Sequence, residues 1–174
     1  VVLSIIHDGK EIEILNEDKE GIIITNQTPF YGESGGQVGD SGNASNAYGQ
    51  MEVLDAIKPL PGIIVHKAKI TNGVITTGDS VTMRVDKITR GDTALNHSAT
   101  HLLHAALKEV LGEHIKQAGS LVAPDRLRFD YTHFSPLTEK ERGKIESLVN
   151  YKVNPWKFFS TFYRVSLLKL KNFY

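Results

Sequence analysis

The chain has 174 residues, of which 40% are hydrophobic and 23% charged, an ordinary composition for a soluble globular protein with a core of one domain or two small ones. Its formal net charge is zero, and it has no cysteine, which excludes disulfides, thiol nucleophiles and zinc–thiolate sites within the chain. No signal peptide and no apolar run long enough to span a bilayer is present, so we expect a cytoplasmic location and no membrane partner.

Short apolar runs separated by turn residues fill the first half of the chain. The runs are residues 1–6, 11–15, 21–25, 50–57, 62–70 and 80–85. Asp8-Gly9, between the first two, is a hairpin-type dipeptide. Strands of this length and spacing predict an antiparallel β-barrel or sandwich over residues 1–90. Residues 28–42, centred on Ser34-Gly35-Gly36-Gln37, are too rich in glycine for regular structure and predict a shaped loop.

Helical periodicity begins in the second half. Asp92 is a good N-cap, apolar residues recur at helical spacing over residues 94–111, and Gly112 ends the predicted helix. Residues 114–122 and 127–134 read as two strands of a hairpin. A capping box, Thr138-Glu139-Lys140-Glu141, opens a helix that runs to about Asn150. The predicted fold class is α+β: an N-terminal antiparallel β-barrel followed by an α/β core of helix, antiparallel strands and helix.

The last residues differ from the rest in composition. Residues 151–174 hold five basic and no acidic residues and eight of the fourteen aromatics, whereas all seven histidines precede them. This predicts three segments, residues 1–90, 91–150 and 151–174. Three explanations for the tail stay open: a reading-frame shift or gene decay, which we favour; an RNA-binding extension of lysines and aromatics; or a membrane-surface segment, which Pro155 and Ser160-Thr161 argue against.

Two histidines on the predicted helix are candidate metal ligands. His97 and His101 are four residues apart and therefore lie one above the other on a helix. Together with His104 they fall opposite an apolar stripe, which is made of Leu95, Ala99, Leu102, Ala106 and Val110. Two imidazoles one turn apart are a known way to hold zinc, although a solvated polar face is an equal reading. Ser98 follows His97, so the general base of an H-E-x-x-H peptidase is missing.

These segments together resemble one family. Residues 96–107, the strands at residues 117–122 and 127–131, and the glycine-rich residues 28–42 are similar to the zinc-site helix, following strands and barrel loop of alanyl-tRNA synthetase editing domains and their free-standing relatives. The resemblance covers residues 1–150 in the family's order. It implies zinc-dependent hydrolysis of the ester in tRNA(Ala) mischarged with serine or glycine. Its implied partners are the acceptor end of tRNA(Ala) and the rest of the synthetase, not DNA.

The resemblance also implies roles for individual residues. His97 and His101 match the first two zinc ligands, and Thr100 matches the residue that senses the substrate's hydroxyl. Gln117 matches a pocket residue beside the metal. Gly35, Gly36 and Gln37, in the glycine-rich loop, are implied to shape the site for the terminal adenosine; the plainer reading of this loop is a tight turn. His104 matches no ligand and is expected behind the ligands or on the surface.

The chain departs from the family pattern in its metal site. The family completes the zinc site with a C-x-x-x-H segment further along, but this chain has no cysteine and no histidine after His133. Two histidines alone bind zinc weakly, so we expect impaired catalysis. Because the sequence begins with valine and not methionine, and leaves no room for an amino-acid-activating domain, we expect a fragment of a synthetase that does not itself charge tRNA. The alternatives are a non-catalytic tRNA-binding remnant and a free-standing trans-editing factor.

Overall fold

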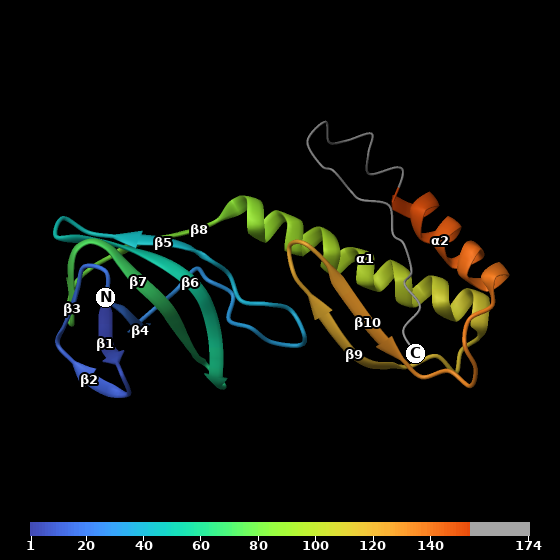
Figure 1. Ribbon diagram of the computed structural model, residues 1–174, viewed down its shortest axis with the longest axis horizontal. Helices are drawn as coiled ribbons and strands as arrows, with labels where there is room; N and C mark the ends of the chain where they lie inside the picture. The colour runs from blue at the N-terminus through green and yellow to red at the C-terminus, as the bar shows by residue number, and fades with distance from the viewer. Residues whose placement is uncertain (154–174) are drawn as a thin grey trace. The chain divides into compact units, whose positions relative to one another are not determined.

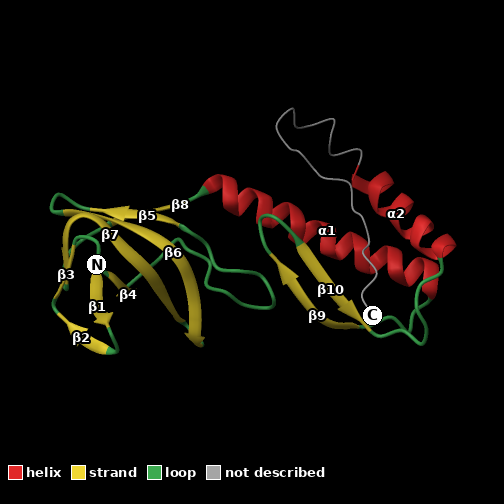
Figure 2. Cartoon of the chain, viewed as in Figure 1, coloured by secondary structure: helices red, strands yellow, loops and turns green. Residues whose placement is uncertain are grey.

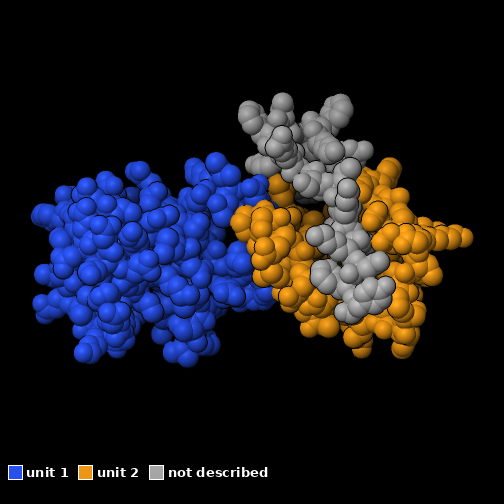
Figure 3. Space-filling model, in the orientation of Figure 1, with its two compact units in different colours: residues 1–92 blue, residues 93–174 orange. Residues whose placement is uncertain are grey.

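The computed structural model describes residues 1–153 of the chain, and the tail predicted to begin at residue 151 lies, from residue 154 on, outside them. Two compact units divide the chain, residues 1–92 and residues 93–174 (Figure 3). The class is α+β, as the sequence predicts, with antiparallel strands and two helices in the described part (Figure 2). No helix in that part is both long and apolar enough to cross a membrane.

The first unit is built around an antiparallel sheet (Figure 1). Its strands are β1 (Val2–His7), β2 (Lys10–Ile12), β3 (Ile14–Asn16), β4 (Glu20–Thr25), β5 (Gly42–Ser45), β6 (Gly49–Leu60), β7 (Ile63–Thr76) and β8 (Thr82–Val85). They follow the order β2-β1-β4-β7-β6-β5-β8, with β3 paired to β7 beside this path. β2 and β8 stand at opposite ends of the path, so the predicted barrel is not confirmed: no closed barrel is found within residues 1–153.

Alternating apolar residues on the long strands β6 and β7 supply much of the core of this unit. Along β6, Met51 and Val53 are buried while Gln50 and Glu52 face water, the pattern of a strand with one face against a core. The largest cluster of buried side chains comprises Val2, Ile5, Leu15, Ile23, Ala44, Met51, Ala68, Ile70 and Ile75.

The predicted hairpin after β1 is confirmed, but the strand after it is not continuous. Asp8 and Gly9 both have positive φ (49° and 74°), as a two-residue turn of the right twist requires. The single strand predicted over residues 11–15 is two strands in the structure. β2 pairs with β1, whereas β3 pairs with β7. This change of partner carries Leu15 into the core.

The first helix begins earlier than the sequence predicts. Helix α1 spans Lys87–Leu111, so Asp92 lies inside it and is not its N-cap. The cap is Asp86, whose carboxylate accepts hydrogen bonds from the backbone N–H groups of Ile88 (2.9 Å) and Thr89 (3.2 Å). These bonds hold the pKa of Asp86 below its ordinary value. Gly112 ends the helix as predicted.

The buried face of α1 is also rotated from the predicted stripe. The buried residues are Thr93, Thr100, Leu103, Ala106 and Leu107. Of the predicted stripe only Ala106 is fully buried. Thr93 and Thr100 are buried although they are polar, which a pattern of hydrophobicity alone does not predict.

The second unit packs a strand pair and a second helix around the apolar side of α1. Strands β9 (Gln117–Val122) and β10 (Leu127–Tyr131) form the predicted hairpin but are shorter than predicted. Helix α2 spans Glu139–Val153 and opens with the predicted capping box: Thr138 N–H donates to the Glu141 carboxylate (2.9 Å), and Glu141 N–H donates to the Thr138 hydroxyl (3.3 Å). The buried core consists of Leu103, Ala106, Leu107, Ile115, Ile145 and Val149.

Candidate functional site

The two candidate zinc ligands lie together on the exposed side of α1. His97 and His101 are both exposed, and their ring centroids are 5.1 Å apart with the planes tilted by 44°. This spacing follows from their positions one turn apart on the helix. A neutral imidazole offers one nitrogen lone pair, so the pair could give a metal two ligands.

The rest of a metal site is not found in the described chain. A zinc site in a protein takes at least three protein ligands. Residues 1–153 contain no cluster of three or more histidine, cysteine, aspartate or glutamate side chains placed to hold a metal ion. The described residues therefore fit half of a zinc site and not a complete one.

Thr100 lies between the two histidines in the sequence and, unlike them, is buried. Its side chain is buried, and its hydroxyl donates a hydrogen bond to the carbonyl of Asn96 (2.8 Å). The Asn96 amide in turn donates to the carbonyls of Ala123 (2.7 Å) and Pro124 (3.2 Å). These bonds tie the middle of α1 to the turn between β9 and β10. The oxygen of Thr100 still has lone pairs with which to accept a bond.

His104, the third histidine, lies at the border of the packed face. Its ring packs on Phe129 of β10, with centroids 5.1 Å apart. Its Nε2 atom is buried and has no hydrogen-bond partner among residues 1–153. Sequence reasoning expected it behind the ligands or on the surface, and the rotated buried face of α1 explains its partial burial.

Gln117 opens β9 with an exposed side chain. Its amide donates to the hydroxyl of Ser120 (3.1 Å), and its backbone pairs with Tyr131 across the hairpin. The structure places it at the end of the strand pair, where its side chain is accessible from solvent.

The glycine-rich loop of the first unit, residues 28–42, has a tight turn at its centre. Ser34 and Gln37 exchange two backbone hydrogen bonds (3.2 and 3.0 Å). Gly35 and Gly36 between them have φ values of 60° and 82°. Two consecutive residues with positive φ are the requirement of a type I′ turn, which glycine meets without a steric cost. The plainer reading of this segment, a tight turn, is confirmed.

An arginine that the sequence did not reveal connects the two ends of this loop. Arg90, in the first turn of α1, forms a salt bridge with Asp40 and donates a hydrogen bond to the carbonyl of Pro29 (2.8 Å). The hydrogen bond that Arg90 donates to Asp40 raises the pKa of Arg90, and the Asp40 carboxylate also accepts the backbone N–H of Tyr31. One arginine thus joins both arms of the loop.

A buried histidine holds the start of this loop, at Thr28. His66, on β7, is completely buried, and burial lowers its pKa from 6.5. Its Nδ1 lies 2.9 Å from the carbonyl of Ile23 and its Nε2 2.8 Å from the Thr28 hydroxyl. Because a carbonyl only accepts, Nδ1 carries the proton and Nε2 accepts from Thr28. The Thr28 oxygen accepts the N–H of Phe30 (3.1 Å), whose ring lies edge-on against His66.

Of these loop-holding residues, Thr28 and Asp40 lie inside the segment that the sequence singled out, whereas His66 and Arg90 lie far from it in the chain. No spacing pattern links a strand histidine or a helix arginine to the loop, so only the tertiary structure could identify them.

Comparison with known proteins identifies the class to which these features belong. Residues 1–89 match the family of class II (A) tRNA synthetases. The chain is 52% identical over 149 residues to the alanine–tRNA ligase of Carboxydothermus hydrogenoformans, 49% over 152 residues to that of Pelotomaculum thermopropionicum and 50% over 150 residues to that of Magnetococcus marinus. The chain belongs to the alanine–tRNA ligase family.

These alignments cover most of the chain but a small part of each relative. They span 86%, 87% and 86% of this chain, and 17% of each of the three ligases. The family resemblance predicted from the helix, strand and loop motifs is thereby confirmed, and with it an enzyme family that acts in tRNA aminoacylation.

Proposed function

We propose that this chain is an editing region of an alanine–tRNA ligase, which hydrolyses tRNA(Ala) mischarged with serine or glycine. The observation that carries the proposal is the exposed pair His97 and His101 on α1, in a chain about half identical to alanine–tRNA ligases. Because residues 1–153 hold no cluster of three metal-ligating side chains, we propose that the reaction is impaired in this chain.

The need for such a reaction follows from the size of the substrates. A pocket that accepts alanine gains only about 1–3 kcal/mol over glycine from one methyl group, and it rejects one extra hydroxyl similarly poorly. A second site that hydrolyses the wrong ester supplies the remaining discrimination. In that reaction water attacks the acyl carbon, the bond to the ribose oxygen breaks, and the amino acid and uncharged tRNA leave.

The residues of this chain would bind and orient the substrate. His97 and His101 would each offer a neutral ring nitrogen to zinc, which when bound supplies the acidity that polarises the ester carbonyl and activates water. The Thr100 oxygen would accept a hydrogen bond from the hydroxyl of a seryl group while its own O–H continues to donate to the Asn96 carbonyl. Gln117 would contact the aminoacyl end. The turn at Gly35, Gly36 and Gln37 would support the terminal adenosine. The cytoplasm, where tRNA is charged, is the proposed location.

A test uses the complete 174-residue chain, assayed for bound zinc and for release of serine from serine-charged tRNA(Ala). We expect zinc to be retained weakly and serine to be released slowly. Replacing both His97 and His101 by alanine should abolish zinc retention and turnover together. His114→Ala, at another exposed histidine of the same unit, is the matched control and should change neither. A chain with neither zinc nor turnover above background would overturn the catalytic proposal.

A second candidate is a tRNA-binding remnant without catalysis, which the absence of a third metal ligand within residues 1–153 favours. tRNA binding should then persist in the presence of a chelator, weaken steeply with salt and fall on deletion of residues 151–174. The third candidate, a free-standing trans-editing factor, requires turnover by the chain without any other part of a ligase.

A further inference from the structure

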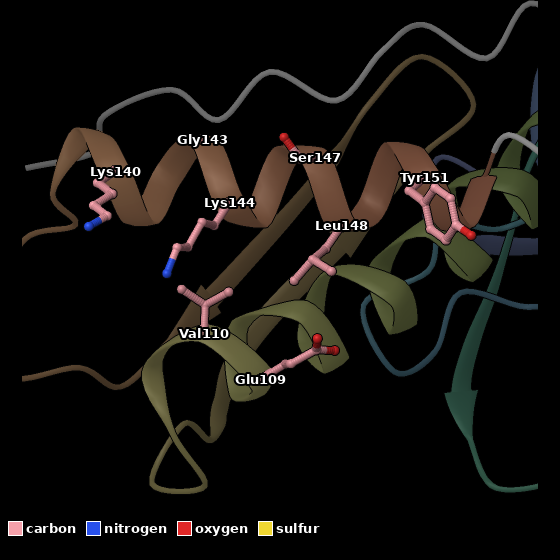
Figure 4. A pocket seen from close by; sticks show the side chains of 8 residues that line it. All are labelled: Glu109, Val110, Lys140, Gly143, Lys144, Ser147, Leu148 and Tyr151. Atoms are coloured by element: carbon pink, nitrogen blue, oxygen red, sulfur yellow. The ribbon is translucent and has the colours of Figure 1, made fainter.

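The second unit has a groove whose lining residues take no part in the candidate metal site. It runs between α1 and α2, has a volume of about 820 Å³ and is lined by eight residues from these two helices (Figure 4). We propose that this groove binds the phosphate backbone of RNA, with Lys140 and Lys144 contacting phosphates and Tyr151 stacking on a base or ribose. The inference rests on the proposed function, which makes tRNA the substrate.

The charge of the groove matches an RNA backbone. Lys140 and Lys144 lie one turn apart on α2, and both direct their ammonium groups toward the groove (Figure 4). Neither forms a salt bridge with another residue of the described chain. Glu109 is the single acidic residue among the eight, and its carboxylate is paired with Lys152 at 3.5 Å. The groove therefore offers two lysines that form no salt bridge within residues 1–153, of which Lys144 also interacts electrostatically with Glu141, and one carboxylate paired with a lysine.

The uncharged lining suits the rest of a nucleotide. Val110 and Leu148 supply an apolar surface between the two helices (Figure 4). Tyr151, further along α2, is 77% exposed, so its ring is open to a bound molecule. An exposed ring beside lysines is the combination with which proteins bind single-stranded nucleic acid, because phosphates pair with the cations and bases stack on the ring.

A glycine within α2 gives an independent reason to expect that a bound RNA backbone approaches the α2 side of the groove closely. Gly143 stands between the two lysines and lines the groove, and an added Cβ there would meet no atom within 4 Å. Glycine in a helix interior is unfavourable compared with alanine. No contact within residues 1–153 requires Gly143 to be small. An RNA backbone lying against the helix at this position would require it.

Salt dependence of binding tests the proposal most directly. Binding of an uncharged tRNA(Ala) transcript to the complete chain would be measured over a range of potassium chloride concentrations. Each phosphate contact contributes about 0.7 to the slope of log K against log salt for single strands, so Lys140→Gln with Lys144→Gln should reduce the slope by about 1.4. Lys10→Gln with Lys19→Gln, two exposed lysines of the first unit, removes the same charge and should leave the slope within error.

Two further variants separate the groove from general electrostatics. Tyr151→Ala should weaken binding about 5- to 10-fold, whereas Tyr151→Phe should bind as the parent does. Gly143→Ala should stabilise the fold and yet weaken binding. The matched Gly91→Ala in α1, where an added Cβ also meets no atom within 4 Å, should stabilise the fold with binding unchanged.

The outcomes distinguish this inference from the proposed function. If the parent chain binds no tRNA, both fail. If it binds tRNA but the lysine pair leaves the slope unchanged, only the groove is excluded, as would also happen if its partner were an acidic protein. If the His97 and His101 double variant loses turnover but keeps both binding and slope, the groove acts as a contact separate from the metal pair.

Discussion

Replacing Gly39 by alanine should destabilise the first unit more than any exposed change in the same loop. An added Cβ at Gly39 would lie 1.9 Å from the carbonyl oxygen of Ala56 and 2.6 Å from a carboxylate oxygen of Asp55. Both are far below van der Waals contact, and one is backbone, so the loop must move away from β6. The same Ala56 carbonyl accepts the N–H of Glu33 at 2.8 Å, and the movement should break this bond as well.

The expected magnitude combines these two effects. Overpacking costs about 1–3 kcal/mol and a lost backbone hydrogen bond about 0.5–1.5 kcal/mol, so Gly39→Ala should lower the free energy of unfolding by about 2–4 kcal/mol. Gly35→Ala is the matched control, because an added Cβ there meets nothing within 4 Å and the cost is that of a left-handed backbone, about 1–2 kcal/mol.

Urea unfolding followed by circular dichroism would give both free energies, with equal slopes as the check that the unfolded states are comparable. The reasoning is refuted if Gly39→Ala unfolds within 0.5 kcal/mol of the parent, a limit set at about the error of exposed substitutions, or if Gly35→Ala is the more damaging of the two.

The buried His66 should make stability depend on pH. Burial lowers the pKa of His66 in the folded protein below 6.5, so the unfolded chain binds a proton first as the pH falls. The free energy of unfolding should therefore decrease as the pH falls from 6.5 to the folded pKa. Above pH 6.5, His66 should have no effect on it. His66→Gln should flatten this part of the stability–pH curve, and an unchanged curve would show that His66 is not its source. The capping assignment predicts that Asp86→Ala lowers the thermal midpoint while Asp92→Ala has a much smaller effect, measured by calorimetry, and equal losses would contradict it.

Local signals in the sequence predicted the elements that depend on local chemistry. The Asp8-Gly9 turn and the Thr138 capping box were found because their geometry is decided by residues close in the chain. The start of α1 was placed at Asp92 because aspartate is a good N-cap and the apolar periodicity begins just after it, but Asp86 caps the helix six residues earlier.

Features that depend on tertiary partners could not be predicted in the same way. Within residues 10–16 the pairing partner changes from β1 for β2 to β7 for β3, a choice that no alternation pattern encodes. In the candidate site, His97 and His101 were predicted from spacing alone, whereas the residues that hold the glycine-rich loop come from β7 and α1 and share no motif. The buried face of α1 was misplaced because it includes two polar residues, Thr93 and Thr100, which a hydrophobic pattern does not count.

The continuity of α1 across the boundary between the two units has a consequence for dividing the protein. Its first residues, including Arg90, belong to the first unit, but the apolar side chains that stabilise the helix lie in the second. A fragment ending at residue 92 would keep only about a turn and a half of α1, and helices so short are marginal in water. Without a stable helix, Arg90 should lose its contacts with Asp40 and Pro29, and the glycine-rich loop should become less ordered. A boundary chosen from compactness alone would therefore destabilise a segment that is distant in sequence from the cut.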